Sequence, residues 1–295
     1  MHLRQLRYFV TIARCRHFAN AAFECGVSQP TLSAGLTALE QELGYRLVER
    51  DRRFVGLTAQ GEAMLPWAEQ ILGAVASMTT SVMAHSSQIT GEFSLAAIPA
   101  ALPLAGLFGK ALLKRYPSLT LAVRSATSRE IERALNTFEC DAGLTYLDHE
   151  PPGNVLSVAL HQERYLFVTR SDGKCGALTK IGWEAAAHQP LCLLHQGMQF
   201  RRILDAQMRA RGLAITPRVV ADSYVTLFDL VRSGGFCTIV PDTYAHLLVG
   251  LSWAKFLPLD ESEQPRRIGL VVVNRAPLSP MAGAAMAVAR EFDTG

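Results

Sequence analysis

Apolar positions between residues 28 and 43 recur at the spacing of one helix face, and the amino-terminal part of the chain is organised around this stretch. The four positions are Leu32, Leu36, Leu39 and Leu43. Ser28 precedes them as a good N-cap residue, Pro30 suits a first helical turn, and Gly44 can end the helix in a left-handed conformation. The pattern therefore predicts a helix over residues 28–43 that buries its leucine face.

The opposite face of this helix carries short hydrogen-bonding side chains, from Gln29, Thr31, Ser33 and Thr37. Such side chains can approach base edges closely, and glutamine pairs well with adenine. A merely solvated polar face is the alternative. The preceding residues favour DNA reading, because a short alanine-containing helix over 18–25 is followed by a tight glycine turn at 26–27. Helix, turn and helix form the unit that places its second helix in the major groove.

Arginines are concentrated in the same part of the chain. Residues 1–60 contain eight arginines, no lysine and five acidic residues, so the other 235 residues carry 21 basic and 21 acidic residues. A basic head on a neutral body suits contact with a polyanion. Arg50, Arg52 and Arg53 cluster at the tip of a predicted hairpin, where they would contact DNA phosphates and set affinity rather than sequence preference. A solvated basic loop is the alternative for this hairpin.

A second long helix is predicted from Thr58, a suitable N-cap, to about Ser87. Its apolar residues follow a heptad rhythm typical of a coiled coil: Met64, Ala68, Ile71, Val75, Met78 and Val82. We expect this seam to pair two copies, which would place their reading helices about 34 Å apart on successive major-groove faces. Pro66 and Glu69 argue against a membrane span. Residues 86–91 are expected to form a hinge.

From Glu92 onward short apolar strands alternate with helices, which is typical of α/β structure. A right-handed parallel sheet is expected from strands at 93–98, 119–124 and 140–145 with helices at 102–116 and 128–138. Further strands are expected at 165–168, 190–194, 218–220, 237–240 and 268–273, and further helices at 200–211, 224–233 and 284–292. We therefore expect two lobes, joined by two chain crossings that allow hinge closure around a ligand.

Six short segments of the head share one resemblance: Leu3–Phe9, Phe18–Ala22, Val27–Ser33, Leu39–Gly44, Leu47–Arg50 and Leu57–Glu62. In order and spacing they resemble a LysR-type transcriptional regulator. The resemblance implies an α/β protein with three parts. These are a winged helix-turn-helix in residues 1–58, a linker and dimerisation helix with a hinge in 59–90, and a two-lobed effector domain, similar to periplasmic binding proteins, in 91–295. Lobe I would comprise about 91–162 and 267–295, and lobe II about 163–266.

The resemblance also implies partners. A dimer, and a homotetramer built from two dimers, would bind double-stranded DNA at an inverted-repeat operator, with RNA polymerase as a further partner. The DNA-binding residues are expected to be Phe18, Ala19, Ser28, Gln29, Pro30, Thr31, Ser33, Ala34, Thr37, Arg50, Arg52, Arg53 and Thr58. The family often has basic or long polar residues where this chain has Ala34-Gly35-Leu36, so fewer base contacts are expected from that turn.

Loops after four predicted strands, together with Asp222 and Ser223 before the predicted helix 224–233, form the candidate effector site, because ligands of open α/β sheets lie beyond the carboxyl ends of the strands. The candidate residues are Pro99, Ala100, Ala101, Ser125, Thr127, Ser128, Thr145, Tyr146, His195, Gln196, Gly197, Met198, Phe200, Asp222 and Ser223. Two of these loops open helices, whose free N–H groups and dipoles favour an anion. We therefore expect a small carboxylate or similar oxyanion as effector, with no cofactor and no metal.

Several of these candidates have alternative roles. Helix capping is the alternative for Thr127, Ser128, Asp222 and Ser223. Packing is the alternative for Tyr146, and an ordinary surface position is the alternative for His195.

Thiol-based redox sensing is the first alternative function. One branch of the resembling family senses peroxide through a cysteine in the loop that corresponds to 195–200, and this chain has Gln199 about where that thiol would be. Cys192 lies nearby in an apolar strand, where a thiol is expected to be neutral and inert. The six cysteines show no CxxC pair and no zinc-ligand spacing, as expected of reduced cytoplasmic thiols.

Two further classes are less consistent with the sequence. An enzyme is not expected, because the chain has no GxSxG, Walker or HExxH motif and no GxGxxG after a strand. A solute-binding protein without DNA-binding activity is disfavoured by the basic head and by the lack of a visible secretory signal. We therefore expect a cytoplasmic, sequence-specific DNA-binding regulator controlled by a small effector between two lobes.

Overall fold

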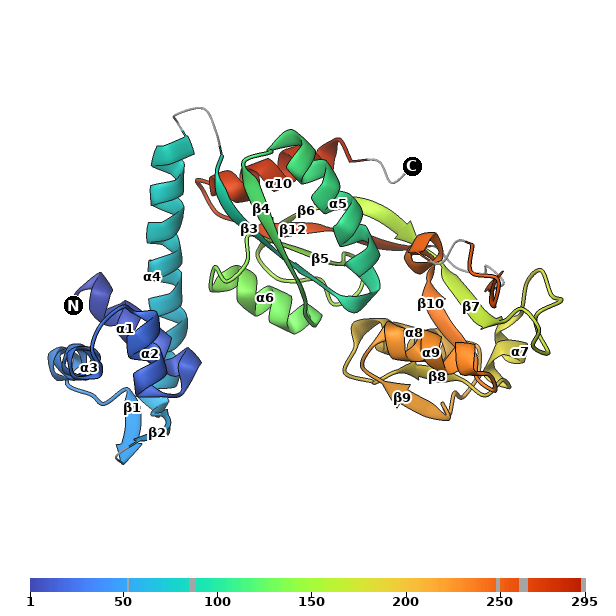
Figure 1. Cartoon of the computed structure of the whole chain (residues 1–295), viewed down its shortest axis with the longest axis horizontal. Coiled ribbons are helices and arrows are strands. Elements are labelled where there is room, and N and C mark those ends of the chain that lie inside the picture. Colours follow the sequence, from blue (N-terminus) through green and yellow to red (C-terminus); the bar gives the residue numbers. More distant parts are fainter. Residues whose placement is uncertain (52, 85–88, 248–249, 260–264, 293–295) are drawn as a thin grey trace. The chain divides into compact units, whose positions relative to one another are not determined.

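The computed structural model describes residues 1–51, 53–84, 89–247, 250–259 and 265–292, and among these the side chains of 50, 51, 53, 77 and 79–84 lie outside the description (Figure 1). The chain forms two compact units, one of residues 1–86 with 136–139 and one of residues 87–135 with 140–295. The first contains the predicted head and linker helix, and the second contains the predicted effector lobes.

The head consists of three helices and a two-stranded ribbon: α1 (Leu3–Cys15), α2 (Phe18–Glu24), α3 (Gln29–Leu43), β1 (Val48–Asp51) and β2 (Arg53–Leu57). Ser28 caps α3 by accepting a hydrogen bond from the Thr31 backbone N–H at 3.3 Å. Gly44 ends α3 in the left-handed conformation, with φ of 77°. Both predicted helix ends are confirmed, and the head is the expected winged helix-turn-helix.

The leucine stripe of α3 forms much of the head core. Leu32, Leu36 and Leu39 are fully buried, whereas Leu43 is 37 % exposed. The predicted stripe is therefore wrong at its last position, because the core contact ends one turn before the helix does. Gly35 has a packing role, since a Cβ at this position would lie 2.5 Å from Tyr8 Cδ2 of α1. The missing side chain lets α1 and α3 approach each other closely.

The linker helix α4 (Ala59–Ala84) has two sets of apolar positions, one packed against the head core and one exposed. Met64 and Ala68 pack against the head core, together with Leu72. The predicted single seam is therefore wrong at its first two positions, because packing within the head already uses them.

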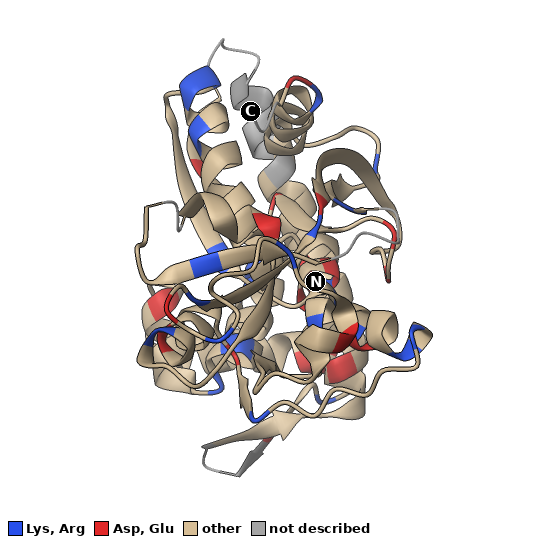
Figure 2. Ribbon diagram, turned by 90° about the vertical axis from the view of Figure 1, so that its right-hand side faces the viewer, with Lys and Arg blue, Asp and Glu red and all other residues tan. Residues whose placement is uncertain are grey.

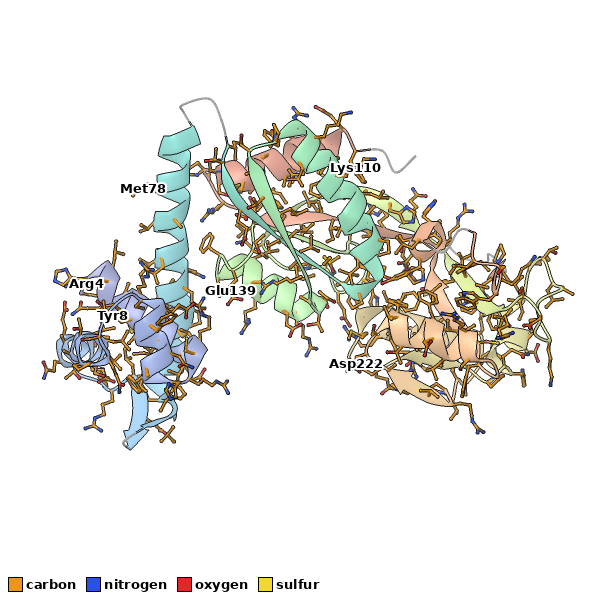
Figure 3. The ribbon with its side chains drawn as sticks, in the orientation of Figure 1. Arg4, Tyr8, Met78, Lys110, Glu139 and Asp222 are labelled. Carbon is orange, nitrogen blue, oxygen red and sulfur yellow. The ribbon has the colours of Figure 1, made fainter. Side chains whose placement is uncertain are left out.

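A different stripe of α4 is exposed. Trp67 is 68 % exposed, Ile71 38 % and Met78 62 %, and Figure 3 labels Met78 on this helix. These positions, with the exposed Ala74 between them, follow a four-three-four spacing, so they lie on one face. Within the described ranges, no helix is long and apolar enough to cross a membrane.

Lobe I is built on a five-stranded sheet in the order β4-β3-β5-β12-β6. Its strands are β3 (Gly91–Ala97), β4 (Leu119–Ser125), β5 (Ala142–Tyr146), β6 (Val155–Glu163) and β12 (Arg266–Val273). Strand β3 pairs in parallel with β4 and β5, as predicted, but β12 runs antiparallel to both β5 and β6. The sheet is mixed because β12 is formed by the chain returning from lobe II. Its helices are α5 (Leu102–Arg115), α6 (Ser128–Asn136) and α10 (Pro280–Arg290), with the 3₁₀ turn η1 (Pro99–Ala101).

Lobe II contains the second group of elements. Its strands are β7 (Tyr165–Arg170), β8 (Cys192–Leu194), β9 (Val219–Ala221), β10 (Thr238–Pro241) and β11 (Ala254–Pro258). Its helices are α7 (Trp183–Ala187), α8 (Gln199–Ala210), α9 (Tyr224–Ser233) and the 3₁₀ helix η2 (Asp242–Leu247). Strands β10, β7 and β11 form one sheet, β8 pairs with β9, and a bridge between Leu191 and Cys237 links the two groups. Only Arg164 separates β6 from β7, so the chain crosses between lobes in extended conformation.

Candidate functional site

The exposed side of α3 presents the polar side chains expected to contact bases. Four positions at its start are exposed: Ser28, Gln29, Pro30 and Thr31. The hydroxyls of Ser28 and Thr31 lie 2.8 Å apart and share a hydrogen bond. The Gln29 side chain makes no hydrogen bond within the part of the chain that the structure describes, so its amide can still reach a base edge. Ser33 and Thr37 are half-buried further along the helix.

The flanking candidates differ in their surroundings. Ala19 and Ala34 are exposed, whereas Phe18 is half-buried and packs against the head core. Phe18 therefore helps to position α2 through its ring. DNA contact by each of these residues stays a prediction.

The ribbon is joined to α3 by a buried acid that the sequence reasoning did not single out. Glu40 is 6 % exposed, and its Oε1 accepts hydrogen bonds from the backbone N–H groups of Leu47 at 2.9 Å and Val48 at 3.3 Å. The sequence feature that could have identified Glu40 is its place on the apolar stripe, one position after Leu39 and one turn after Leu36. Because Glu40 holds the first residues of β1, it fixes the ribbon relative to the reading helix.

The ribbon itself is an antiparallel pair with an irregularity between Glu49 and Arg50. Arg52 lies outside the described residues, as do the side chains of Arg50 and Arg53, so their phosphate contacts stay predictions. Thr58 donates its hydroxyl to the Arg46 carbonyl at 2.6 Å and accepts from the Gly61 N–H at 3.0 Å. Thr58 thus secures the junction of ribbon and linker helix.

In the second unit, loops from both lobes meet at a small cavity. Its volume is about 10 Å³, which is the space of a single water molecule. Six predicted residues line it, namely Pro99, Ala100, Thr127, Ser128, Met198 and Phe200. Gln199, Ile98 and Leu194 complete the lining. Residues of three predicted loops, at 99–100, 127–128 and 198–200, therefore meet at one cavity, and effector binding there stays a prediction.

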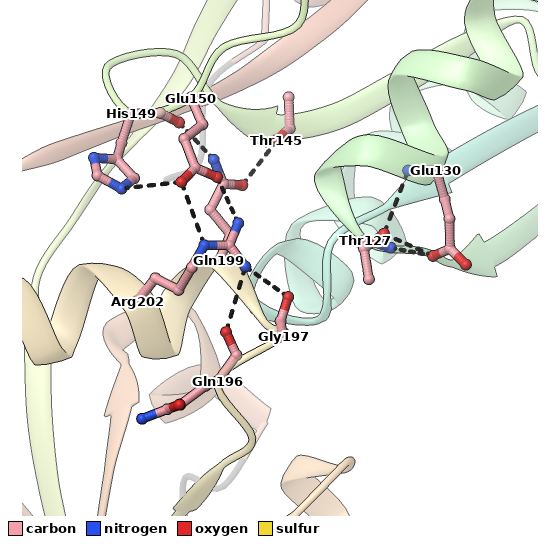
Figure 4. Close-up of polar contacts among 9 residues, drawn as sticks. All are labelled: Thr127, Glu130, Thr145, His149, Glu150, Gln196, Gly197, Gln199 and Arg202. Carbon is pink, nitrogen blue, oxygen red and sulfur yellow. Dashed lines mark hydrogen bonds and ion pairs between the residues drawn. The ribbon is translucent and has the colours of Figure 1, made fainter.

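Gln199 makes the central polar contacts between the lobes (Figure 4). Its side chain is buried, with Nε2 donating to the His149 carbonyl and Oε1 accepting from the Thr145 hydroxyl at 3.3 Å. One turn later, Arg202 donates to Glu150 Oε2 at 2.5 Å and to the Gly197 carbonyl at 2.6 Å. The hydrogen bond from Arg202 lowers the pKa of Glu150. The start of α8 in lobe II therefore holds the loop after β5 in lobe I.

A second set of contacts joins η2 of lobe II to η1 of lobe I. The Thr243 hydroxyl donates to the Ala100 carbonyl at 3.0 Å, and the Tyr244 hydroxyl donates to the Pro99 carbonyl at 2.7 Å. The backbone carbonyls of the predicted effector residues Pro99 and Ala100 therefore already accept bonds from lobe II. Ala101 is fully buried and does not line the cavity.

The two helix starts are less favourable to an anion than predicted. At α6, the Thr127 N–H donates to Glu130 at 2.7 Å and its hydroxyl donates at 2.9 Å, and these bonds lower the pKa of Glu130. An ionised carboxylate therefore already occupies this positive helix end. At the start of α8, the Arg201 guanidinium donates to Asp205 at 2.7 Å and to the Leu194 carbonyl at 2.8 Å. These partners already use the positive charge that an anion would need.

Tyr146 belongs to the chain crossing and not to the cavity. It is fully buried, and its hydroxyl lies 2.8 Å from both carboxylate oxygens of Glu163, to which it donates. Burial raises the pKa of Glu163 well above its usual range. The effector contact predicted at Tyr146 gains no support, because Tyr146 does not line the cavity and its hydroxyl is used by this buried acid.

Other predicted residues also lie outside the cavity lining. His195 Nδ1 accepts a hydrogen bond from the Gly197 N–H at 3.0 Å, which shapes the turn before α8. Ser223 caps α9 by accepting from the Val225 N–H at 3.2 Å. The remaining candidates, Ser125, Gln196 and Asp222, are exposed. Local turn and cap geometry therefore explains His195 and Ser223.

The cysteines nearest the cavity are poorly suited to reaction. Cys192 is fully buried in β8, and burial raises its pKa to about 11. Burial also raises the pKa of Cys237, which lies on the neighbouring strand segment. In the head, a hydrogen bond to Glu24 raises the pKa of Cys15. These thiols are therefore protonated at neutral pH.

Comparison with known families defines the class of protein. Residues 3–62 match the bacterial regulatory helix-turn-helix protein of the lysR family, and residues 86–293 match the LysR substrate binding domain. The chain belongs to the LysR family of DNA-binding transcriptional regulators and has an effector-binding domain; it is a regulator and not an enzyme.

Several individual LysR-family proteins are similar to this chain over most of their length. The chain is 31 % identical over 273 residues to a probable hydrogen peroxide-inducible genes activator of Mycobacterium avium, covering 90 % of this chain and 86 % of the relative. It is 27 % identical over 279 residues to the dual regulator OxyR of Escherichia coli K12, covering 94 % and 91 %. Full-length OxyR of Pseudomonas aeruginosa, in a cysteine-to-aspartate variant, is similar in structure, with a TM-score of 0.78, 26 % identity and coverage of 98 % and 94 %.

The fold is also that of CbnR, a LysR family regulator solved in complex with its target DNA. The TM-score is 0.73, at 23 % identity and 99 % coverage of both chains. The predicted winged helix-turn-helix with an α/β effector domain is confirmed by these neighbours.

Proposed function

We propose that the head reads operator DNA with the start of α3 and holds the phosphates with the β1–β2 ribbon. The observation that carries this is the exposed polar start of α3, where the Gln29 amide has no partner among the described residues. The eight arginines of the first 60 residues support it, since the other 235 residues carry equal numbers of basic and acidic residues. Figure 2 shows the basic positions in blue and the acidic positions in red along the ribbon.

Replacing Gln29 by alanine is expected to reduce the preference for operator over random duplex by about 1–3 kcal/mol. The reason is that one bidentate base contact is lost while phosphate contacts remain. Competition binding with operator and random DNA at fixed salt measures the change. Exposed Gln41 on the same helix provides the control variant Gln41→Ala. Equal losses on operator and random DNA for Gln29→Ala would contradict base reading.

We further propose that the chain acts as a dimer through the exposed stripe of α4, and as a tetramer through the effector units. Trp67, Ile71 and Met78 form an apolar stripe of the length that suits helix pairing. In the effector unit, each lobe has an exposed valine on an edge strand, Val123 on β4 and Val220 on β9. Exposed apolar edges of this kind favour association with another chain.

For the effector, we propose a small uncharged molecule with hydrogen-bonding groups, bound where Gln199 meets Thr145. Three observations support this class over the carboxylate expected from the sequence. The cavity has the volume of one water, Glu130 already occupies the α6 start, and Arg201 and Arg202 are both paired. A ligand of several heavy atoms must part Gln199 from Thr145, and such a ligand would favour the open arrangement of the lobes.

Calorimetric titration with paired small carboxylic acids and their amides or alcohols tests this proposal. Heat is expected from uncharged compounds, and Gln199→Ala is expected to change their affinity because the Gln199 side chain lines the cavity. Gln196→Ala is the matched control, since this side chain is exposed and outside the cavity. Binding restricted to the ionised acids would overturn the uncharged class.

A peroxide response is the second candidate, favoured by the names of the relatives. Gln199 stands about where the peroxide-sensing branch of the family has its cysteine, so a thiol response here would have to use another residue, with Cys192 the nearest candidate. Because the Cys192 thiol is buried and its pKa is raised to about 11, we expect hydrogen peroxide to leave operator binding unchanged. Operator binding before and after peroxide treatment, with parallel thiol counting, measures this. A response that disappears in Cys192→Ser would establish the redox function instead.

A further inference from the structure

A groove on lobe I is not used by any contact described above. It lies between α5 and α10, two helices that pack against each other (Figure 1), and it has a volume of about 500 Å³. Small-molecule sites commonly have volumes of about 300–1,000 Å³. No residue of this groove lines the interlobe cavity. The groove is therefore large enough to be a separate ligand site.

The floor of the groove is apolar because both helices contribute apolar side chains to it. Leu107 and Ala111 lie one turn apart on α5. Val288 lies in the last turn of α10, and Phe292 follows two residues beyond the end of that helix. The Phe292 ring packs edge-on against buried Phe108, with ring centroids 5.8 Å apart. Phe108 thus holds the aromatic part of the floor in place.

The rim of the groove is basic. Lys110 and Lys114 follow Leu107 on the same face of α5, at intervals of three and seven residues, and both are exposed (Figure 3 labels Lys110). The one acid in the lining, Glu291, is already paired with Arg115 at 2.5 Å. The side chain of neither lysine has an ion pair or hydrogen bond among the residues described by the structure. Among the residues that the structure describes, the two lysine ammonium groups of the rim therefore have no acidic partner above the apolar floor.

We propose that the α5–α10 groove binds an amphipathic small anion, a carboxylate attached to an apolar chain. The carboxylate lies between the ammonium groups of Lys110 and Lys114, and the chain covers Ala111, Val288 and Phe292. The Arg115–Glu291 pair closes one part of the lining and leaves the two lysines as the anion-binding groups. Charge complementarity at the rim and apolar burial on the floor thus select the same ligand class.

The probe is decanoate, titrated into the full chain by calorimetry, with decanol and acetate as half-ligands. Decanoate should bind at one site per chain, and each half-ligand should bind at least about tenfold more weakly, because it lacks either the charge or the chain. The double variant Lys110→Glu/Lys114→Glu should weaken decanoate binding by about tenfold or more. Lys174→Glu, an exposed lysine of lobe II, should leave it unchanged. Hydrogen exchange should locate protection in residues 104–115 and 285–292.

A second variant keeps the charges and removes the space. Ala111→Trp would fill the floor, so decanoate binding should be lost while the lysines remain. Unchanged affinity in both variants, equal binding of decanol, or many weak sites per chain would overturn the proposal. Two other outcomes would also overturn it by assigning the groove to another occupant. One is lysine-dependent binding of an acidic amphipathic peptide without decanoate binding, and the other is a change in sedimentation with Ala111→Trp, which indicates a second copy.

Discussion

Replacing Glu40 by alanine is expected to lower the free energy of opening of the β1–β2 ribbon by about 3 kcal/mol. Glu40 is 6 % exposed and accepts two backbone hydrogen bonds, from Leu47 and Val48. Its removal leaves both N–H groups without their acceptor beside a packed core in which Leu47 and Val48 are themselves buried. The cost of an unsatisfied buried donor is about 1–3 kcal/mol for each group.

Hydrogen exchange of the full chain measures this change where it occurs. A loss of 3 kcal/mol corresponds to about a hundredfold faster exchange in peptides that contain the ribbon. Operator affinity should fall with it, because the ribbon no longer keeps a fixed position relative to α3.

Two matched variants separate the hydrogen bonds from other effects of the mutation. Glu40→Gln keeps an oxygen acceptor and should lose less stability than Glu40→Ala. Gln41→Ala, on an exposed position of the same helix, should leave ribbon exchange unchanged. Normal ribbon exchange in Glu40→Ala would show that Glu40 is not the anchor.

The head could be predicted from the sequence because its signals are local. Ser28 and Gly44 lie within a few residues of the helix ends that they determine, and the leucine spacing fixes which face is buried. Glu40 was missed because its partners lie beyond the next turn. The linker seam was only partly predictable, since Met64 and Ala68 suit both a coiled coil and the head core, and only the fold decides between them.

In the effector unit, too, features set by neighbouring residues could be predicted, whereas contacts between residues far apart in the chain could not. Strand β6 is not predicted by the sequence pattern, because Ser157 and the polar end from His161 to Glu163 divide and shorten its apolar run. The strand-end rule correctly brought Thr127 and Met198 to one cavity. The partners of Gln199 could not be predicted, because Thr145 and His149 lie about 50 residues earlier in the chain and no spacing rule connects them.

Replacing Glu163 by glutamine is expected to stabilise the effector unit at neutral and alkaline pH and to have little effect at acidic pH. Burial raises the pKa of Glu163 in the folded state, with nearby Asp242 adding to this rise, whereas the hydrogen bond from Tyr146 and the charge of Arg266 lower it. The folded chain therefore holds a proton that the unfolded chain releases above the ordinary carboxyl pKa of about 4.3. Stability must then fall as the pH rises from that value toward the raised pKa.

The glutamine variant removes this dependence, because an amide does not ionise and its oxygen can still accept the bond from Tyr146. The difference in stability between variant and wild type should therefore increase with pH, by at most about 1.4 kcal/mol per pH unit. The nearby contact between His161 and Asp242, at 2.9 Å, is present in both proteins, so it does not contribute to the difference.

Denaturation from pH 4 to 8, followed by tryptophan fluorescence, measures the difference. Trp183 and Trp253 report lobe II, and a Trp67→Phe background in both proteins removes the signal of the linker helix. Gln162→Ala, the neighbouring position on β6, is the control and should change stability equally at every pH. A difference for Glu163→Gln that does not vary with pH would show that the charge of this carboxyl is not penalised by burial. A loss of stability at every pH would show that the native contact needs the carboxyl group itself.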